Sequence, residues 1–311
     1  MSDLFEEKSI NPMLISEMSE AFDSPDYIYE LKFDGERCIA YLDPQSGTEL
    51  RNKRNMKMLP KVPELSEIHK QVNHRCILDG ELAVLVDGKP DFFEIQRRSL
   101  TSNEFKIRLM SQKHPASFIA FDILYDTDHE TVSIPLLERK KLLQDAVNEN
   151  ERLAVSRYIE QNGIAFYKLA EQQDLEGIVA KHKDSKYFFN KRSKDWIKIK
   201  NLQDEDFVVC GYIQKESNVT SVILGQYQDN ALIYKGHVSL GVSSDDFRVI
   251  SSISKIYTAP FIPLPAGNEN AVWLDPKLMC TVKYMMKTAN GGLRQPVLKG
   301  IRFDKDPKDM T

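Results

Sequence analysis

A lysine stands at the end of an apolar run in the segment YIYELKFDGERCIAYLD, residues 27–43. The alternation of side chains along a strand gives Lys32 a defined direction. The pair Asp34 and Gly35 predicts a tight turn directly after it, and Arg37 then returns on the neighbouring strand within reach of the same pocket. An amine held in this way is a candidate nucleophile, although the same pattern fits a surface hairpin that carries an ion pair.

The chemistry open to such a lysine depends on its protonation. It attacks phosphorus only as a neutral amine, and at an unperturbed pKa near 10.4 only about one molecule in a few thousand is neutral at pH 7. Burial and neighbouring cations both lower the pKa of an amine. The segment WIKIK supplies two such cations, because Lys198 and Lys200 share one strand face with Trp196. A bound metal ion would add positive charge.

Other short segments carry the carboxylates, aromatic rings and cations that phosphoryl transfer uses for positioning and charge neutralisation. Residues 181–200 hold seven Lys and one Arg against two Asp, and residues 51–61 hold five basic residues and no acidic one. These stretches indicate a surface that faces a polyanion or, alternatively, two solvated basic edges. The short segments are LDGEL at 78–82, FIAFDILY at 118–125, LEGIVAK at 175–181, WIKIK at 196–200 and IRFDK at 301–305.

In this order, KFDGER at 32–37 and the five segments above resemble the nucleotidyltransferase motifs I, III, IIIa, IV, V and VI of ATP-dependent DNA ligases. The basic run at 51–61 resembles motif Ia. The segments PLLERKKLL, EGIVAK and LRQPVLKGIRFDK are most similar to the ligase domain of bacterial end-joining ligases, called ligase D. The resemblance extends from about residue 10 to 307.

Local patterns predict mixed secondary structure. Asp-Gly pairs at 34, 79 and 87 separate short apolar or alternating runs, which favours antiparallel strands joined by tight turns. Helices are predicted for VPELSEIHKQV from Val62, for SIPLLERKKLLQDAVNE with Ser133 as its cap, and for residues 156–173. Beyond the acidic NLQDED, some five strands and one helix near 244–256 fit a small barrel.

Together with the resemblance, this predicts an α+β protein of two domains. The first, residues 1–202, is expected to be an ATP-grasp-like nucleotidyltransferase domain of antiparallel sheets with flanking helices. The second, residues 203–311, is expected to be an OB-fold β-barrel. Such a chain is a ligase of minimal build, without the polymerase and phosphoesterase modules often fused in ligase D.

The resemblance implies a reaction in three steps. Lys32 attacks the α-phosphate of ATP, releases pyrophosphate and becomes a lysyl-adenylate. The AMP then moves to a 5′-phosphate at a break in duplex DNA, and a 3′-hydroxyl displaces it to seal the strand. The expected partners are nicked or broken double-stranded DNA and a Ku-like end-binding protein, with roles in DNA repair and end joining.

The resemblance also assigns roles to single residues. Lys32 is the expected nucleophile, Glu30 recognises adenine, and Phe121 stacks on the base. Glu176 is the metal-binding carboxylate, with Glu81 beside it, for Mg²⁺ or Mn²⁺. The remaining assignments are Arg37 and Glu81 to the ribose and neighbouring phosphate, Lys198 and Lys200 to the α-phosphate, and Arg302, Asp304 and Lys305 to the pyrophosphate leaving group.

The chain departs from the family pattern in three places. The motif Ia arginine is either Arg51 or Arg54, and the spacing to VPEL slightly favours Arg54. The usual LRHP reads LRQP at 293–296, and the usual VGTG reads VSLG at 238–241. The last two departures concern contacts with DNA more than adenylation.

Several site residues have ordinary structural alternatives. Glu81 and Glu176 could be solvated strand ends, Lys198 and Lys200 a solvated face, and Phe121 plain core. At the level of function, an RNA ligase or an mRNA-capping guanylyltransferase would use the same lysine chemistry. A non-catalytic OB-type nucleic-acid binder is the alternative from a different class.

Bulk composition excludes some classes. The net charge of -4 argues against a protein coated in positive charge, and no apolar run is long enough to span a membrane. The acidic N-terminal segment is unlike a signal peptide, so the expected location is the cytoplasm, at the bacterial nucleoid. The four cysteines have no C-x-x-C spacing and are expected to be buried and unpaired. We expect a monomer.

Overall fold

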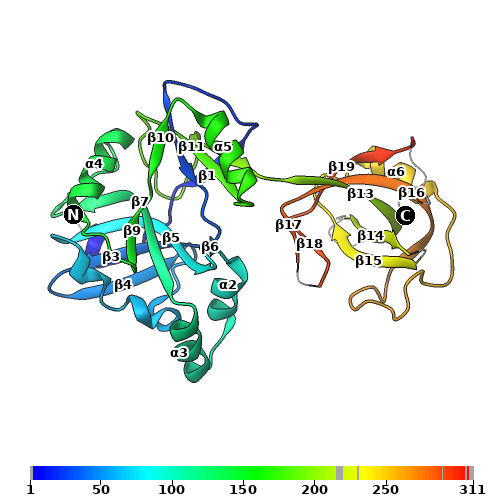
Figure 1. Ribbon diagram of the computed structural model, residues 1–311, viewed down its shortest axis with the longest axis horizontal. Helices are drawn as coiled ribbons and strands as arrows, with labels where there is room; N and C mark the ends of the chain where they lie inside the picture. Colours follow the sequence, from blue (N-terminus) through cyan, green and yellow to red (C-terminus); the bar gives the residue numbers. More distant parts are fainter. Residues whose placement is uncertain (1–2, 215–219, 230, 289, 305–306, 308–311) are drawn as a thin grey trace. The chain divides into compact units, whose positions relative to one another are not determined.

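The computed structural model describes residues 3–214, 220–229, 231–288, 290–304 and 307. The chain divides into two compact units, Met1–Asn201 and Leu202–Thr311, which are described separately (Figure 1). Antiparallel sheets dominate both units and helices are few, so the expected α+β class is confirmed.

The first unit contains a five-stranded sheet in the order β1-β12-β11-β2-β10. The edge strand β1 runs parallel to β12, and the other neighbours are antiparallel. The strands of this sheet are β1 (Leu14–Met18), β2 (Tyr27–Leu31), β10 (Tyr158–Glu160), β11 (Gly177–His182) and β12 (Arg192–Lys200).

A second sheet of the first unit has the order β4-β3-β5-β7-β8, with β6 paired to β5 and β9 to β7. Both of its faces are covered: Leu78 packs into one apolar cluster, and its neighbour Ile77 packs into another. The second cluster also takes Ile28 and Trp196 from the five-stranded sheet, so the two sheets share a core. The strands are β3 (Glu36–Asp43), β4 (Gly47–Asn52), β5 (Cys76–Val86), β6 (Lys89–Pro90), β7 (Ala116–Asp126), β8 (His129–Glu130) and β9 (Leu153–Val155).

The helices of the first unit are short. The side chain of Asp91 accepts hydrogen bonds from two backbone N–H groups at the start of α2, and Asn103 caps α3 in the same way. A helix that spans a bilayer would need a longer apolar run than any described helix of this chain offers. These helices are α1 (Leu4–Glu7), α2 (Phe92–Leu100), α3 (Glu104–Lys113), α4 (Leu136–Ala146) and α5 (Gly163–Gln172).

The helix predictions were partly wrong. VPELSEIHKQV forms no α-helix but short 3₁₀ turns at Pro63–Leu65 and Ile68–Gln71, whose apolar residues reach the core. Helix α4 begins after Pro135, so Ser133 does not cap it. The predicted helix at 156–173 begins only at Gly163, because the residues before it form β10. Helices α2 and α3 were not predicted.

The Asp-Gly pairs also behave differently from the prediction. Only the pair at 87 forms a hairpin turn, between β5 and β6. Gly80 lies inside β5, where an added Cβ would meet the Phe118 ring at 2.5 Å. Asp34 and Gly35 do not close a hairpin, because β2 and β3 belong to different sheets. Gly35 instead crosses close to the Leu82 carbonyl oxygen, 2.1 Å from where its Cβ would lie.

The second unit is built on an antiparallel sheet in the order β15-β14-β13-β16-β19. A parallel bridge between Leu240, just after β15, and Val297 joins its two edges, so the sheet curves into a barrel. A capping box of Ser243 and Asp246 starts helix α6. The elements are β13 (Gln203–Gln214), β14 (Thr220–Gln228), β15 (Ala231–Val238), α6 (Ser244–Ser252), β16 (Val272–Tyr284), β17 (Met286–Lys287), β18 (Leu293–Arg294) and β19 (Val297–Arg302).

The four cysteines, Cys38, Cys76, Cys210 and Cys280, are buried and unpaired, as the sequence predicts. Burial raises the pKa of each thiol, so all four stay protonated near neutral pH. They are therefore small core residues.

Candidate active site

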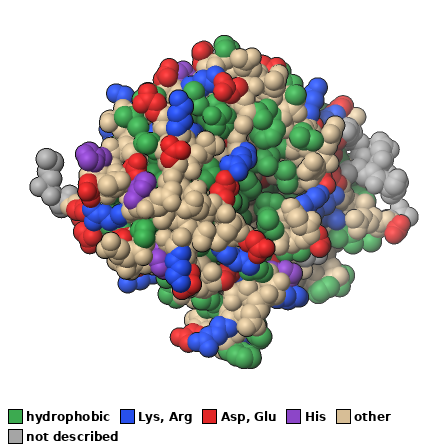
Figure 2. All heavy atoms as spheres, turned by 60° about the vertical axis from the view of Figure 1, so that its left-hand side comes forward, with side chains coloured by type: hydrophobic (Ala, Val, Ile, Leu, Met, Phe, Trp, Pro, Cys, Tyr) green, Lys and Arg blue, Asp and Glu red, His purple; other side chains and the backbone are tan. Residues whose placement is uncertain are grey.

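A cavity of about 770 Å³ opens in the first unit and is lined by both sheets and by helix α2. On the face drawn in Figure 2, Lys and Arg side chains are interspersed with Asp and Glu over the described surface. Inside the cavity, by contrast, seven Lys and Arg side chains and three Glu side chains are among the lining residues, so a small polyanion can be held there. The predicted site residues that line the cavity are Glu30, Lys32, Arg37, Arg54, Glu81, Phe121 and Lys198.

Lys32 lies one residue beyond the end of β2. Its backbone N–H donates to the carbonyl oxygen of Gly177 at 2.9 Å, which continues the pairing of β2 with β11. Its ammonium group donates to Glu176 Oε2 at 2.7 Å, and 23% of the side chain is exposed. The amine therefore points into the cavity and remains accessible to a ligand.

Two carboxyl groups, Glu81 and Glu176, lie near this amine in surroundings that disfavour their charge. Burial raises the pKa of Glu81 to about 8, against the attraction of Lys32 and Arg37, and the nearby Glu176 raises it further. Burial also raises the pKa of Glu176, although Lys32 opposes this effect. Neither carboxyl is a solvated strand end. Perturbation of this kind is typical of functional sites.

The two lysines of WIKIK lie beside Lys32. Lys198 lines the cavity, and its pKa is lowered by burial and then by the charges of Lys200 and Lys32. The ammonium group of Lys200 is 3.8 Å from Glu176 Oε1, so the same carboxylate contacts Lys32 and Lys200. Two ammonium groups are therefore paired with one carboxylate, and the ammonium group of Lys198 is near enough to interact with all three charges.

The floor of the cavity holds an ion cluster that the sequence analysis did not identify. Glu30 is buried and pairs with Lys140 at 2.6 Å and with Lys181 at 3.0 Å. Burial favours the neutral acid, but the two lysines outweigh it and lower the pKa of Glu30. Burial lowers the pKa of Lys181 to about 8. Lys181 ends the LEGIVAK segment, whereas nothing in the spacing marks Lys140.

Phe121 forms part of the cavity wall and is only partly buried, so it is more than plain core. Cations lie over its ring, with the Arg37 guanidinium 4.5 Å and the Lys181 amine 4.4 Å from the ring centroid. Trp196 meets the ring edge to face. This packing fixes the orientation of the ring.

Arg37 is held by Asp79 through two parallel hydrogen bonds, from Nε at 2.6 Å and from Nη2 at 2.5 Å. Asp79 is fully buried and also accepts from the Tyr187 hydroxyl at 2.6 Å. Asp79 therefore has a structural role, in which it orients the guanidinium toward the cavity. Asp122 is equally buried and pairs with Arg139, away from the lining residues.

The two motif Ia candidates have different surroundings, Arg51 in strand β4 and Arg54 in the loop after it. Arg54 lines the cavity. Arg51 is not among the lining residues, and it pairs with Glu49 at 2.6 Å and donates to the Asn55 carbonyl oxygen at 3.0 Å. The structure therefore brings Arg54 toward the other site residues.

A divalent cation is compatible with the donors near Lys32. Among the described residues, no three His, Cys, Asp or Glu side chains are arranged to hold a metal by themselves. Magnesium usually keeps several waters and uses one or two carboxylates together with substrate phosphates. Glu81 and Glu176 suit a site of that kind, because burial disfavours the charge of both carboxylates and a bound cation would compensate it.

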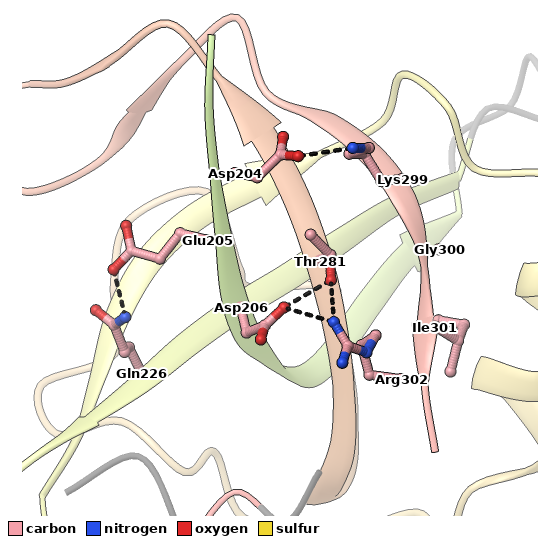
Figure 3. A pocket seen from close by; sticks show the side chains of 9 residues that line it. All are labelled: Asp204, Glu205, Asp206, Gln226, Thr281, Lys299, Gly300, Ile301 and Arg302. Atoms are coloured by element: carbon pink, nitrogen blue, oxygen red, sulfur yellow. Dashed lines mark hydrogen bonds and ion pairs between the residues drawn. The ribbon is translucent and has the colours of Figure 1, made fainter. Parts of the chain in front are cut away.

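The second unit holds the last predicted motif on β19 (Figure 3). Arg302 donates twice to Asp304, at 2.8 and 2.6 Å, and lies 3.8 Å from Asp206. Asp206 in turn accepts from the Thr281 hydroxyl at 2.6 Å. Lys305 lies outside the described residues. Two of the three predicted residues are therefore paired with each other.

Comparison with known families gives matches along most of the chain. Residues 10–200 match the family described as ATP dependent DNA ligase domain, and residues 215–305 match the ATP dependent DNA ligase C terminal region. The chain is 29% identical to the SPbeta prophage-derived DNA ligase-like protein LigB of Bacillus subtilis, covering 94% of this chain and 99% of that protein. It is 30% identical to DNA ligase C of Mycobacterium tuberculosis, covering 80% and 72%.

Larger relatives and solved structures extend this picture. The chain is 27% identical to the multifunctional non-homologous end joining DNA repair protein LigD of M. tuberculosis, and spans 40% of its length. The crystal structure of the ligase domain of that LigD aligns with a TM-score of 0.57 and 25% identity, covering 98% of both chains. A mycobacterial DNA ligase D solved with ATP aligns equally well. The match covers both units, including the barrel expected to be an OB fold.

Proposed function

Because the chain belongs to the ATP-dependent DNA ligase family, we propose that it joins 5′-phosphate and 3′-hydroxyl ends in duplex DNA through an AMP bound to Lys32. Membership of this family implies that ATP is the nucleotide substrate, and it confirms the DNA ligase assignment made from the sequence. The observation that supports Lys32 is its place in a cavity with Glu176, Lys198 and Lys200 around it.

In the first step, Lys32 Nζ forms a bond to the α-phosphorus of ATP while the bond to pyrophosphate breaks. Nζ must lose a proton to do so, and Glu176 lies 2.7 Å away, where it can accept that proton. Lys198 and Lys200 compensate the negative charge of the phosphate. The AMP then passes to the 5′-phosphate of the DNA, and attack by the 3′-hydroxyl releases it.

The nucleotide is held by the walls of the same cavity. We assign the base to Phe121 and Glu30, because both side chains line the cavity and the Glu30 carboxylate is fixed by two lysines. Arg37 and Glu81 are assigned to the ribose and the neighbouring phosphate. Arg54 is the preferred motif Ia arginine, since it lines the cavity.

Glu176 and Glu81 are the proposed ligands of a magnesium or manganese ion. Such an ion would neutralise negative charge on the phosphates during transfer. Arg302, Asp304 and Lys305 are proposed to act on the pyrophosphate leaving group.

Broken duplex DNA is the proposed partner, and repair and end joining are the proposed setting, because LigD of M. tuberculosis, which matches 99% of this chain, is named for non-homologous end joining and DNA repair. We assign Met1–Asn201 to the adenylation domain and Leu202–Thr311 to the OB-fold domain. We further propose that the enzyme is a monomer, acts at the nucleoid and is assisted by a Ku-like end-binding protein.

The test begins with the intact mass of the purified protein after incubation with ATP. Wild type should gain one AMP, and Lys32→Ala should gain none. Lys141→Ala is a matched control, because Lys141 is an exposed lysine of α4. An adduct that persists in Lys32→Ala would place the nucleophile elsewhere.

A second experiment identifies the substrates. Labelled ATP or GTP is offered first, and then nicked DNA or nicked RNA. Labelling by ATP followed by sealing of nicked DNA supports the proposal. Preference for GTP would favour a capping enzyme, and sealing of RNA alone would favour an RNA ligase. Comparing nicked with blunt-ended duplex, with and without a Ku-like protein, separates nick sealing from end joining.

A further inference from the structure

Glu36 places a negative charge in the wall of a cavity proposed to hold phosphates. It is the first residue of β3, it is half-buried, and it lines the same cavity as Lys32 and Arg54. A carboxylate in this position repels phosphate, so it weakens binding unless it does something else. The hydrogen bonds of Glu36 indicate a second, structural role.

The Glu36 carboxylate connects two other walls of the cavity. Its Oε1 accepts from the Asn52 side-chain amide at 2.8 Å. Its Oε2 accepts a hydrogen bond from the Ser99 hydroxyl on helix α2. Asn52 ends β4, so one carboxylate joins β3, the loop after β4, and α2.

Asn52 organises the loop that carries Arg54. It is only 3% exposed, and its side-chain oxygen accepts from the backbone N–H groups of Arg54 and Met56, each at 3.0 Å. The backbone N–H of Asn52 donates to the Met56 carbonyl oxygen at 3.0 Å. The turn at Asn55 has a left-handed backbone with φ of 59°. One buried amide therefore determines the shape of residues 52–56.

A side-chain amide can adopt two orientations that exchange its NH₂ group and its oxygen. An ionised carboxylate has no hydrogen to donate, so Glu36 favours the orientation in which the NH₂ group of Asn52 faces it. The Asn52 oxygen then faces the loop, where it accepts hydrogen bonds from the backbone N–H groups of Arg54 and Met56. In the opposite orientation, the Asn52 NH₂ group would face the two N–H donors of the loop, and the Asn52 oxygen would face the Glu36 carboxylate.

We infer that Glu36 is a positioning residue for Arg54, which it fixes in the cavity through the orientation of the Asn52 amide. This inference rests on the proposed function, since it takes Arg54 to contact phosphate. The phosphate could belong to ATP or to the 5′ end of the DNA. Glu36 itself touches neither.

The alternative effect of Glu36, simple repulsion of phosphate, has the opposite sign. If repulsion dominated, any neutral substitution would tighten phosphate binding. If positioning dominates, Glu36→Ala should weaken binding, whereas Glu36→Gln keeps an acceptor for Asn52 and should remain close to wild type. Asn52→Asp should also weaken binding, because two carboxylates would then face each other.

The experiment measures two steps separately in the full chain. The KM for ATP is measured for lysyl-adenylate formation, and the KM for a nicked duplex with a 5′-phosphate is measured for sealing by enzyme already adenylated. We expect Glu36→Ala to raise one KM about 10-fold, the size of one lost hydrogen bond to a charged group, and Glu36→Gln to change it less than about 2-fold. The step affected identifies which phosphate Arg54 contacts.

A double-mutant cycle with Arg54→Ala tests whether Glu36 acts through Arg54. Because the two residues share one function, Glu36→Ala should have little further effect in an Arg54→Ala background. Glu67→Ala, which removes an exposed carboxylate paired only with Lys70, is the matched control and should leave both KM values unchanged. Additive effects, or tighter binding by Glu36→Ala, would overturn the inference.

Hydrogen exchange provides a readout that does not depend on activity. The backbone N–H groups of Arg54 and Met56 should lose protection in Glu36→Ala and keep it in Glu36→Gln. Equal protection in both variants would contradict the role assigned to Glu36. Failure of wild type to form a lysyl-adenylate would instead refute the proposed function and would leave the exchange result to judge the loop.

Discussion

Two arginine–aspartate pairs have nearly the same chemistry but different positions in the first unit. Arg37 with Asp79 lies beside the cavity, and Arg139 with Asp122 is fully buried away from its lining. Both aspartates accept two hydrogen bonds from their arginine. The pairs therefore separate the contribution of such a pair to stability from its contribution to binding.

We predict that Asp79→Asn and Asp122→Asn each lower the free energy of unfolding by about 3–5 kcal/mol, because each leaves an arginine charge without its partner. Denaturant unfolding measures this loss. Only Asp79→Asn should also weaken ATP binding by the folded fraction, since only Arg37 lines the cavity. Equal ATP affinity in the two variants would show that Arg37 does not contact the nucleotide.

Glu81 predicts a pH dependence of stability. Its carboxyl has an ordinary pKa of 4.5 in the unfolded chain and a pKa of about 8 in the folded chain, chiefly because of burial. The folded state therefore binds the proton more tightly, and the stability that this contributes is full below pH 4.5 and is lost as the pH rises to about 8. At neutral pH the folded chain therefore largely keeps a proton on Glu81 that the unfolded chain releases, and this difference lowers the stability of the protein.

Glu81→Gln should remove this dependence. Relative to wild type, its free energy of unfolding should rise between about pH 4.5 and 8 and level off above, by up to about 1.4 kcal/mol per unit of pKa shift. Denaturant titrations across this range measure it, with Glu67→Gln as an exposed control. Parallel stability curves for Glu81→Gln and wild type would refute the raised pKa.

At the scale of elements, the connection from β2 to β3 decides the geometry of the site. Residues 32–35 carry the chain from one sheet to the other, so Lys32 and Arg37 approach the cavity from different sheets. A hairpin would have placed them on adjacent strands. The crossing requires the chain to pass close to β5, where the Leu82 carbonyl oxygen leaves no room for a side chain at Gly35.

We therefore predict that Gly35→Ala destabilises the first unit by about 2 kcal/mol or more and slows lysyl-adenylate formation, because a Cβ would push the crossing away from β5. Thermal unfolding and the rate of AMP incorporation measure the two effects. Gly300→Ala is the control, since nothing lies within 4 Å of a Cβ at that position. A Gly35→Ala protein with normal stability and rate would mean that the backbone yields at little cost.

At the scale of the whole molecule, an acidic chain is proposed to bind a polyanion. The net charge is -4, yet the 51–61 and 181–200 stretches are strongly basic. Binding to DNA should then depend on a limited number of phosphate contacts and on little reading of the base sequence.

We predict that the Kd for nicked duplex rises steeply with salt, by about 10³-fold or more between 50 and 200 mM if six or more phosphates are contacted. Fluorescence anisotropy at several salt concentrations measures the slope. Replacing Lys53, an exposed lysine of the cavity wall, with Ala should reduce the slope by about one contact. A flat salt dependence would argue against DNA binding through phosphates.

The sequence by itself determined which residues have the chemistry for nucleotidyl transfer, and the faces they occupy on their strands. The alternation in WIKIK placed Trp196, Lys198 and Lys200 together, because strand periodicity is a local property. The barrel strands and the helix near 244–256 were likewise predicted from local patterns. The 3₁₀ turns after Val62 were not, since packing against the core outweighs local preference there. Helices α2 and α3 were also missed, although Asp91 and Asn103 are local N-cap signals for them.

Only the tertiary structure decided which charges meet. Glu30 pairs with Lys140 and Lys181, and Glu36 reaches Asn52 and Ser99, through contacts between residues far apart in the chain. The same applies to Gly35, whose role depends on the closeness of β5. Such contacts form only when sheets and helices pack against each other, so the spacing of residues in the sequence does not predict them.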